Sequence, residues 1–597
     1  MVCAAPTVNV QGASNVAIVS TQYAPEVALR SRTRIGADAL IMAAVIVIFW
    51  LIIRLGYDAA YSPIDRIPQA VAFDTSPWRL PYYAARSLAR MFAALIASTI
   101  FTFVYATVAA RSRRAEKILI PLLDILQSVP VLGFLSVTLT LWLRLFPGSE
   151  MGVEFASIFA IFTSQVWNMT FAFYQSQITV PKELDDVSRL MRLTRWQRFW
   201  QIDAPHGVIP LVWNGMMSFG GGWFFLIASE VIAVNNNEYA LPGIGSYVAA
   251  ASANEQMGRI LLAILVMILM VVGTNFLFWR PLTAWAERFR LGDSKGATEQ
   301  RSVVLSIIRH SAIPGLITKA GPAVRRFTDK ATKPFGLAEP PLVVNQTKRR
   351  AGDIAFGVIV GLLVLWGLYS MFVYLQNSVG LGEFITAFWL GFITFLRVLA
   401  FTVIATLIWV PIGVWIGLNP KVTSIAQPVV QVLASFPANF LFPFIAVLLI
   451  RLGPHSLNYG SIFLMALGAQ WYILFNVIAG AAAIPNDLRE AASNLRLNLW
   501  QKWRYLYGPA VFGSWVTGGI TAAGGAWNAS IVAEVVSYGQ THMVAPGLGS
   551  YITEATGAGD FPRVLIGVIV MSVFVVGLNR VLWKPLNNRA ERRYNYA

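Results

Sequence analysis

Three pairs of charged or amide side chains interrupt apolar stretches that are long enough to cross a membrane. They are Arg90 and Arg397, Asp124 and Gln431, and Glu230 and Glu534. An ionisable side chain inside a bilayer is costly to bury, so it commonly contacts a solute or pairs with a charge on a neighbouring helix. We expect the arginines and glutamates to pair and brace the helices, and contact with a solute is the alternative.

Two tracts of mixed polar and aromatic residues lie between apolar stretches, at residues 182–205 and 485–509. The first contains DVSRLMRLTRWQRFWQIDAP and the second EAASNLRLNLWQKWRYLYGP. Both are too charged to span a bilayer, whereas their leucines and aromatic residues could anchor a short helix with its charged side towards water. Each tract therefore predicts a surface helix, which either binds a partner protein or lies at the membrane surface without one.

The remaining reactive residue types form no pattern typical of catalysis or metal binding. The histidines are His206, His310, His455 and His542, and none of their spacings fits a metal site. Cys3 is the single cysteine, which excludes an intrachain disulfide and a cysteine-based metal site. The sequence also has no G-x-x-x-x-G-K-[ST] phosphate loop. We therefore expect no enzyme activity, cofactor or metal in this chain.

The chain is unusually apolar, with 56% hydrophobic and 13% charged residues among 597. Soluble domains carry about 25% charged residues, so the composition indicates a polytopic membrane protein surrounded by lipid. The formal charge of +17 could suggest a nucleic-acid partner, but the basic residues fall between apolar stretches and not on one folded domain. Basic loops are typical of the cytoplasmic side of membrane proteins, so we expect no nucleic acid.

The apolar segments predict an all-α protein with about twelve transmembrane helices. Six segments precede a basic linker rich in proline and glycine, at about 35–55, 86–110, 117–145, 152–178, 207–234 and 258–282. Six more follow it, at about 353–374, 389–417, 424–450, 459–482, 510–537 and 562–586. The organisation is an N-terminal region (1–34), a first repeat (35–287), the linker (288–350), a second repeat (351–590) and a tail (591–597).

Basic residues predict the orientation of the chain. The linker carries 13 Lys and Arg against 4 Asp and Glu, and both tracts add basic residues on the same side. Because basic loops stay in the cytoplasm, the tracts, the linker and both termini are predicted to be cytoplasmic. Within the linker, residues 303–309 are expected to form a short amphipathic piece.

The two halves of the chain are copies of one pattern. With a shift of 304 residues Trp167 matches Trp471, and Pro242-Gly243 matches Pro546-Gly547. Upstream of Trp167 the shift becomes 307 residues. An even number of spans in each repeat leaves both copies in the same orientation, related by a pseudo-twofold axis along the membrane normal. A translocation path between the halves suits that geometry.

The two tracts resemble the coupling loop of bacterial ABC importer permeases, which begins with EAA and ends with a proline. The second copy matches at Glu490, Ala491, Ala492, Trp500, Gln501 and Pro509. The first copy is a weaker match, at Asp186, Trp196, Gln197 and Pro205. The outer loops LPGIGSYV and APGLGSYI, together with the two arginines Arg90 and Arg397, narrow the resemblance to the nitrate, sulfonate, taurine and bicarbonate group. Most members have one such half per chain, so a fused pair is a departure.

This resemblance implies the type I ABC importer permease fold in a bacterial inner membrane, with a small anion as solute. It also implies two cytoplasmic ABC ATPase subunits on the coupling loops, and a substrate-binding protein that docks outside on residues 235–257 and 538–560. The alternative is a secondary transporter or channel driven by a gradient, since such carriers also contain parallel repeats.

One departure from the family occurs in both tracts. The family usually has glycine at the seventh position of the motif, where this chain has Arg192 and Arg496. Glycine suits a turn with positive φ, which an arginine adopts only at a cost. The sequence therefore predicts either a reshaped turn or a helix that continues through this point.

Overall fold

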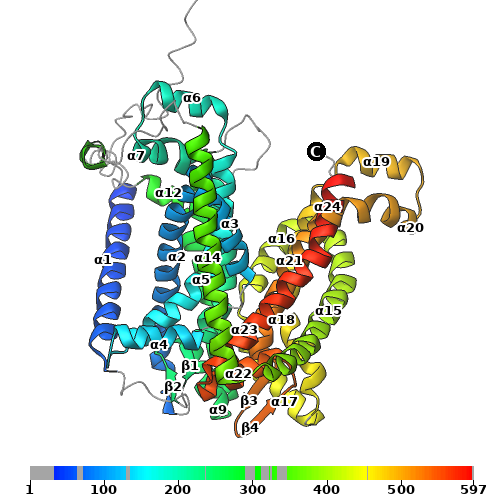
Figure 1. The fold of residues 1–597 in the computed structure, drawn as a ribbon. Coiled ribbons are helices and arrows are strands. Elements are labelled where there is room, and N and C mark those ends of the chain that lie inside the picture. Colours follow the sequence, from blue (N-terminus) through cyan, green and yellow to red (C-terminus); the bar gives the residue numbers. More distant parts are fainter. Residues whose placement is uncertain are drawn as a thin grey trace, which may run out of the picture.

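The computed structural model describes residues 32–63, 72–128, 135–234, 237–289, 303–310, 322, 326–332, 346–453 and 455–593. These residues form two helical lobes that lie side by side and diverge towards one end (Figure 1). The first repeat makes one lobe, and most of the second repeat makes the other. The strands in the described parts of the chain form two short antiparallel hairpins.

The first lobe contains the helices α1 to α11. They are α1 (Arg32–Tyr61), α2 (Leu80–Arg111), α3 (Arg113–Ser128), α4 (Leu135–Leu145), α5 (Met151–Ile178), α6 (Lys182–Leu190), α7 (Arg195–Arg198), α8 (Ala204–Glu230), α9 (Ile244–Ala253), α10 (Met257–Thr274) and α11 (Arg280–Ala286). Its hairpin pairs β1 (Val231–Val234) with β2 (Asn237–Ala240).

The second repeat contains the helices α14 to α24. They are α14 (Gln346–Ser378), α15 (Gly382–Gly417), α16 (Pro420–Ser435), η9 (Ala438–Leu441), α17 (Phe442–Leu452), α18 (Leu457–Ala482), α19 (Asn486–Asn494), α20 (Leu499–Lys502), α21 (Gly508–Ala533), α22 (Leu548–Ala558), α23 (Phe561–Leu578) and α24 (Lys584–Arg593). Its hairpin pairs β3 (Val535–Tyr538) with β4 (Thr541–Val544).

Three long helices form the centre of each lobe, namely α2, α5 and α8 in the first and α15, α18 and α21 in the second. Trp223 on α8 and Trp527 on α21 match under the 304-residue shift, and both are buried in these centres. Four π-helical turns repeat at the same interval. They are η5 (Phe199–Asp203) with η10 (Trp503–Tyr507), and η6 (Asn275–Trp279) with η11 (Asn579–Trp583). The backbone therefore confirms the internal repeat, including its local departures from the α-helix.

The expected count of twelve membrane spans is not confirmed. In the described residues, seven helices are long and apolar enough to cross a membrane, or eight if α16 and the η9–α17 segment count as one span bent by 80°. The helices α5 and α21 lie at expected spans but are not among these seven. α5 carries buried polar residues such as Glu154 and Gln165. The span expected at 117–145 corresponds to α3 and α4, and residues 129–134 between them lie outside the described parts.

The first helix of the second repeat, α14, contacts both lobes. Arg114 Nε on α3 lies 2.5 Å from Asp353 Oδ1 on α14, while α14 also packs against α23 of its own repeat. In the linker, α12 (Val303–His310) occupies the place of the short helix expected at residues 303–309, and it packs against α1 and α11. Residues 1–31 and 594–597, which include most of the N-terminal region and the tail, lie outside the described parts.

Candidate functional site

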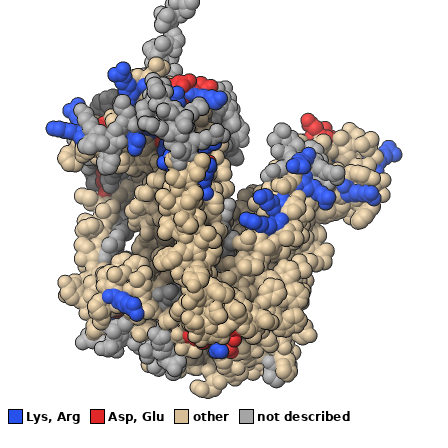
Figure 2. All heavy atoms as spheres, viewed as in Figure 1, with Lys and Arg blue, Asp and Glu red and all other residues tan. Residues whose placement is uncertain are grey.

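The polar segments of the two lobes gather at opposite ends of the molecule. The helices α6, α7, α19 and α20 lie where the lobes diverge, which we name the coupling end, and both hairpins lie at the other end, which we name the hairpin end (Figure 1). Lys and Arg side chains gather at the coupling end of both lobes, and the surface is hollowed between the lobes there (Figure 2). Both tracts therefore lie on the same side of the molecule.

Each tract is a helix, a tight turn and a second helix. Arg192 follows α6 and Arg496 follows α19, and both residues have φ 48° in the left-handed region. In each tract, the carbonyl of the third-last residue of the first helix accepts a hydrogen bond from the backbone amide of the residue that follows the arginine. The two bonds are Leu193 N to Ser188 O (3.1 Å) and Leu497 N to Ala492 O (3.2 Å). This is the bond of a Schellman turn, which usually has glycine at the left-handed position. The helix therefore does not continue, and the turn keeps a glycine-type backbone with arginine in the glycine position.

The glutamine of each Trp-Gln pair closes a capping box. Gln197 N donates to Thr194 Oγ1 (3.2 Å), and Thr194 N donates to Gln197 Oε1 (3.0 Å). Asn498 and Gln501 exchange the same bonds at 2.8 and 2.9 Å. The box satisfies two backbone donors that a helix start would otherwise leave free. These glutamines therefore fix where α7 and α20 begin.

The π-helical turns join α7 to α8 and α20 to α21 without a break. Pro205 and Pro509 stand at the start of α8 and α21, directly after each turn. Proline lacks the amide hydrogen that would donate to the carbonyl four residues earlier, so an α-helical bond is missing at this point in both lobes. In the first lobe residues 195–230 form one continuous helical rod. α7 therefore continues directly into α8.

Apolar side chains project from the outer surface of both tracts. Leu190 is 84% exposed, Leu495 72% and Trp500 73%. Asp186 and Glu490 are also exposed, whereas Trp196 is half-buried and packs edge-on against Trp200. Large exposed apolar groups beside charged ones are typical of a protein interface.

The two tracts are fastened to the long helices by different contacts. In the first lobe Arg111 at the end of α2 lies 2.5 Å from Asp203, and Arg198 lies between Asp203 and Asp185. In the second lobe Arg489 instead donates to a backbone carbonyl of α18 (3.0 Å). Both arrangements hold the first short helix of the tract against the membrane-spanning helices.

At the hairpin end, a buried carboxylate ties three segments of each half together. Glu230 and Glu534 are 0% exposed. Donors to Glu230 are Arg90 Nη1 (2.6 Å), Ser87 Oγ (2.5 Å) and Gly245 N (2.6 Å). Donors to Glu534 are Arg397 Nη1, Thr394 Oγ1 and Gly549 N, each at 2.8 Å. We name each set the buried clasp. In the first lobe it joins α2, the end of α8 and the start of α9, and in the second it joins α15, the end of α21 and the start of α22.

The glycine of each outer-loop Pro-Gly pair makes room for the buried clasp. A Cβ atom on Gly243 would overlap the Glu230 carboxylate, and one on Gly547 would overlap that of Glu534. Both glycines have extended backbone, with φ −173° and −179°, so close approach and not an unusual φ requires glycine here.

The first lobe extends its buried clasp with three more charges. Arg90 Nε lies 2.6 Å from Glu154 Oε2, and Arg86 Nη2 lies 2.6 Å from Glu150 Oε1 while also contacting Glu154. In the second lobe Arg397 Nε donates instead to a backbone carbonyl (3.2 Å). Among the described residues, the clasp of the first lobe is therefore a five-charge network, and that of the second is a single ion pair.

Each hairpin reaches across to the other lobe. Gly539 N at the tip of the β3–β4 hairpin donates to Ser252 O on α9 (3.2 Å), and α22 packs against β1. The hairpin end is therefore closed by contacts between the lobes, whereas the coupling end is open.

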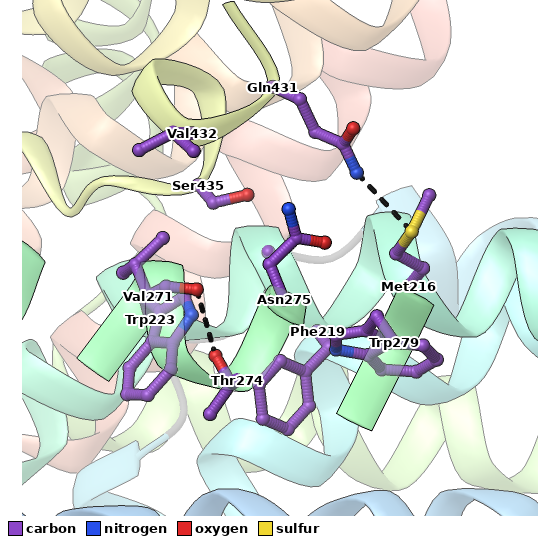
Figure 3. Close-up of a pocket in the computed structure, with 11 residues that line it drawn as sticks. Met216, Phe219, Trp223, Val271, Thr274, Asn275, Trp279, Gln431, Val432 and Ser435 are labelled. Atoms are coloured by element: carbon purple, nitrogen blue, oxygen red, sulfur yellow. Dashed lines mark hydrogen bonds between the residues drawn. The ribbon is translucent and has the colours of Figure 1, made fainter. Parts of the chain in front are cut away.

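A small cavity lies where α8, α10 and η6 of the first lobe meet α16 of the second. Gln431 lines it and its Nε2 lies 3.3 Å from Met216 Sδ across the lobe boundary (Figure 3). Gln431 therefore lies between the lobes. Its counterpart Asp124 lies on α3, and the Asp124 side chain is outside the described parts of the structure.

Comparison with known proteins agrees with this architecture. Residues 98–280 and 409–582 each match the family described as the inner membrane component of binding-protein-dependent transport systems. The chain belongs to this family. The two matches together cover more than half of the chain, with one match in each repeat. The resemblance read from the two tracts is therefore confirmed, and the fold is that of a type I ABC importer permease with two fused halves.

Three relatives show what this permease is similar to. The bicarbonate transport system permease protein CmpB of Synechococcus elongatus is 27% identical over 197 residues, which are 33% of this chain and 67% of CmpB. CmpB of Synechocystis sp. is 26% identical over 256 residues, 38% of this chain and 85% of the relative. The nitrate import permease protein NrtB of Leptolyngbya laminosa is 25% identical over 225 residues, 36% of this chain and 75% of the relative. Each relative therefore corresponds to about one half of this permease.

Family membership makes the chain a transport subunit. In the described residues no group of three or more His, Cys, Asp and Glu is placed to hold a metal ion.

The sequence predicted that the arginines Arg90 and Arg397 would pair with the glutamates Glu230 and Glu534. It did not predict the roles of Ser87 and Thr394, or the charges that extend the first clasp. The matched spacing of Ser87 with Arg90, and of Thr394 with Arg397, could have indicated them.

Proposed function

We propose that this permease forms the whole translocation path of an ATP-driven importer for a small oxyanion, with nitrate and bicarbonate as the leading candidates. Two ABC ATPase subunits would bind at the coupling end, and a substrate-binding protein would dock at the hairpin end. We name the two tracts, residues 182–205 and 485–509, the coupling segments. Their presence in one chain supports this proposal most directly, because one chain then offers a docking site to each ATPase subunit.

The orientation follows from charge. Lys and Arg gather at the coupling end (Figure 2), and basic segments remain in the cytoplasm. The coupling end would therefore face the cytoplasm, where ATP is available, and the hairpin end would face outward. We also propose that the described terminal helices α1 and α24 begin and end on the cytoplasmic side.

The coupling segments have the features of docking elements for a motor. Their tips expose Leu190 and Trp500, and a capping box fixes the second short helix of each. Ion pairs hold the first segment, and an arginine bound to a backbone carbonyl holds the second. Closure of an ATPase dimer would draw the two tips together and rotate α8 and α21, because the second short helix of each tract, α7 or α20, is continuous with one of these helices. The lobes would then close at the coupling end and part at the hairpin end.

The solute class is supported by the relatives. CmpB and NrtB are permeases for bicarbonate and nitrate, and both ions are small, singly charged oxyanions. A transporter driven by an ion gradient is the alternative function, and it would need no pair of exposed coupling helices.

The test uses the complex purified from its own cells through a tag on this chain and reconstituted in liposomes. We expect uptake of labelled nitrate or bicarbonate that requires ATP on the cytoplasmic side. The double variant Glu490→Lys/Trp500→Ala should lose ATPase subunits and uptake, while Trp366→Ala, an exposed tryptophan within the spanning helix α14, retains both. Uptake that persists without ATP and follows a proton or sodium gradient would establish the alternative.

A further inference from the structure

The glycine stretch of α8 meets two hydroxyl groups of the other lobe. A Cβ atom on Gly220 would lie 2.6 Å from Ser435 Oγ, and one on Gly221 would lie 3.3 Å from Tyr472 Oη. The Tyr472 ring also lies beside Gly525, because a Cβ atom on Gly525 would lie 3.6 Å from Tyr472 Cε2. Since Gly525 is the 304-residue match of Gly221, Tyr472 stands between the glycine stretches of both lobes. The contact of the two lobes at the glycine stretch is thus lined by hydroxyls.

The cavity described above adjoins this contact on the Gly220 side. Asn275, Gln431 and Ser435 gather on one side of it, and Thr274 lies on the other side with the aromatic rings of Phe219, Trp223 and Trp279 (Figure 3). Its volume is about 20 Å³, which suits a single group the size of a water molecule or an oxygen atom. We name Gly220, Gly221, Ser435, Tyr472 and this cavity the interlobe constriction.

One polar atom of the cavity wall lacks a partner. Trp279 is 4% exposed, and its Nε1 has no hydrogen-bond partner in the described part of the chain. An indole N–H can only donate, so a ligand that satisfies it must offer an acceptor. A small oxyanion has acceptors on every oxygen, whereas a cation has none.

The charge of the constriction fits passage of an anion. None of the residues that line the cavity is ionisable. A lysine or arginine would hold an anion tightly, and a carboxylate would repel it, whereas conduction requires a site that the solute can both enter and leave. Neutral amide and hydroxyl donors meet that requirement. At the position of Gln431 the first half carries Asp124, so the amide is supplied by the second half alone.

We propose that the interlobe constriction is the oxyanion-binding site of the translocation path, with Gln431, Ser435 and Tyr472 as its donors. The donors would hydrogen-bond the oxygens of a planar ion such as nitrate or bicarbonate as the lobes separate around it. This inference rests on the proposed importer function and adds to it the residues that select the solute.

The experiment measures ATP-driven uptake of labelled nitrate and bicarbonate by the reconstituted complex, together with ATP hydrolysis stimulated by the substrate-binding protein. Gln431→Glu places a carboxylate in the constriction, and Gln376→Glu places the same charge at an exposed position near the end of α14, away from the contact of α8 with α16. We expect Gln431→Glu to lower uptake at least about tenfold while stimulated hydrolysis persists, because charge repulsion replaces a donated bond. Gln376→Glu should transport normally.

A second pair of variants removes donors without adding charge. Ser435→Ala and Tyr472→Phe should each raise the KM for the oxyanion by about tenfold, whereas Ser378→Ala, at an exposed site of α14, should not. If Gln431→Glu fails to assemble, this pair decides, and wild-type KM values in both would overturn the inference. Normal uptake by Gln431→Glu would overturn it as well while leaving the importer function intact. A wild-type complex that takes up neither ion with ATP would overturn the proposed solute class and the inference together.

Discussion

The buried clasp of the second lobe should show strong energetic coupling between its two charges. Glu534 is fully buried, and Arg397 is the one cation that contacts it among the described residues. Arg397→Met leaves that carboxylate with only Thr394 and backbone amides as donors, and breaking a buried pair in this way costs about 3 to 5 kcal/mol. Replacing both charges, in Arg397→Met/Glu534→Gln, leaves no uncompensated charge. The double variant should therefore be no less stable than Arg397→Met alone.

The free energy of unfolding is measured by SDS titration of the purified chain in mixed micelles, for the wild type, both single variants and the double variant. The double-mutant cycle should give a coupling energy of about 2 kcal/mol or more, as expected for a buried ion pair. Thr517→Ala, at an exposed hydroxyl of α21, serves as the control and should change stability little. Additive single effects, with a coupling energy below about 0.5 kcal/mol, would refute the assignment of the pair as a brace.

Three further predictions concern the backbone. Arg496→Gly should raise the free energy of unfolding by about 0.5 to 1 kcal/mol, because glycine adopts φ 48° without the cost that arginine bears. A lower free energy of unfolding in this variant would contradict the left-handed backbone at Arg496. Gly547→Ala should destabilise the hairpin end because its Cβ would overlap the Glu534 carboxylate, whereas Gly524→Ala, with open space at its Cβ, should be tolerated; equal melting temperatures for the two variants would contradict this. Asn498→Ala should cost about 1 kcal/mol by removing the capping box, measured as earlier proteolysis of the coupling segment, and unchanged cleavage would argue against the cap.

The repeat and the family were accessible from the sequence because tryptophan, proline and glycine recur at a fixed shift. The predicted count of twelve spans is not confirmed in the described residues. The sequence alone does not reveal that α16 and α17 are bent by 80° at Pro437, or that buried polar groups on α5 are accommodated by neighbouring helices. Hydropathy measures composition along the chain, whereas these features depend on packing between segments far apart in it.

The candidate site was predicted in part. Charged residues within apolar segments indicated that Arg90 and Glu230 would pair with an opposite charge. The Gly245 amide and the Ser87 hydroxyl could not be predicted, because they bind Glu230 only through tertiary contact. The turn at Arg192 shows a different limit. Because arginine disfavours positive φ, the sequence predicted a reshaped turn or a continuing helix. The structure instead keeps the glycine-type turn, and Arg192 adopts the costly left-handed backbone.

The central claim is that ATP draws the two coupling segments together, and the distance between their tips tests it most directly. Spin labels at Glu183→Cys on α6 and Asn494→Cys on α19, in a Cys3→Ser background, occupy exposed positions on opposite lobes. In the complete complex, pulsed dipolar spectroscopy should show this distance shorten by several ångströms, roughly one helical turn, with ATP and vanadate, and recover with ADP. An unchanged distance during active ATP hydrolysis would contradict the account.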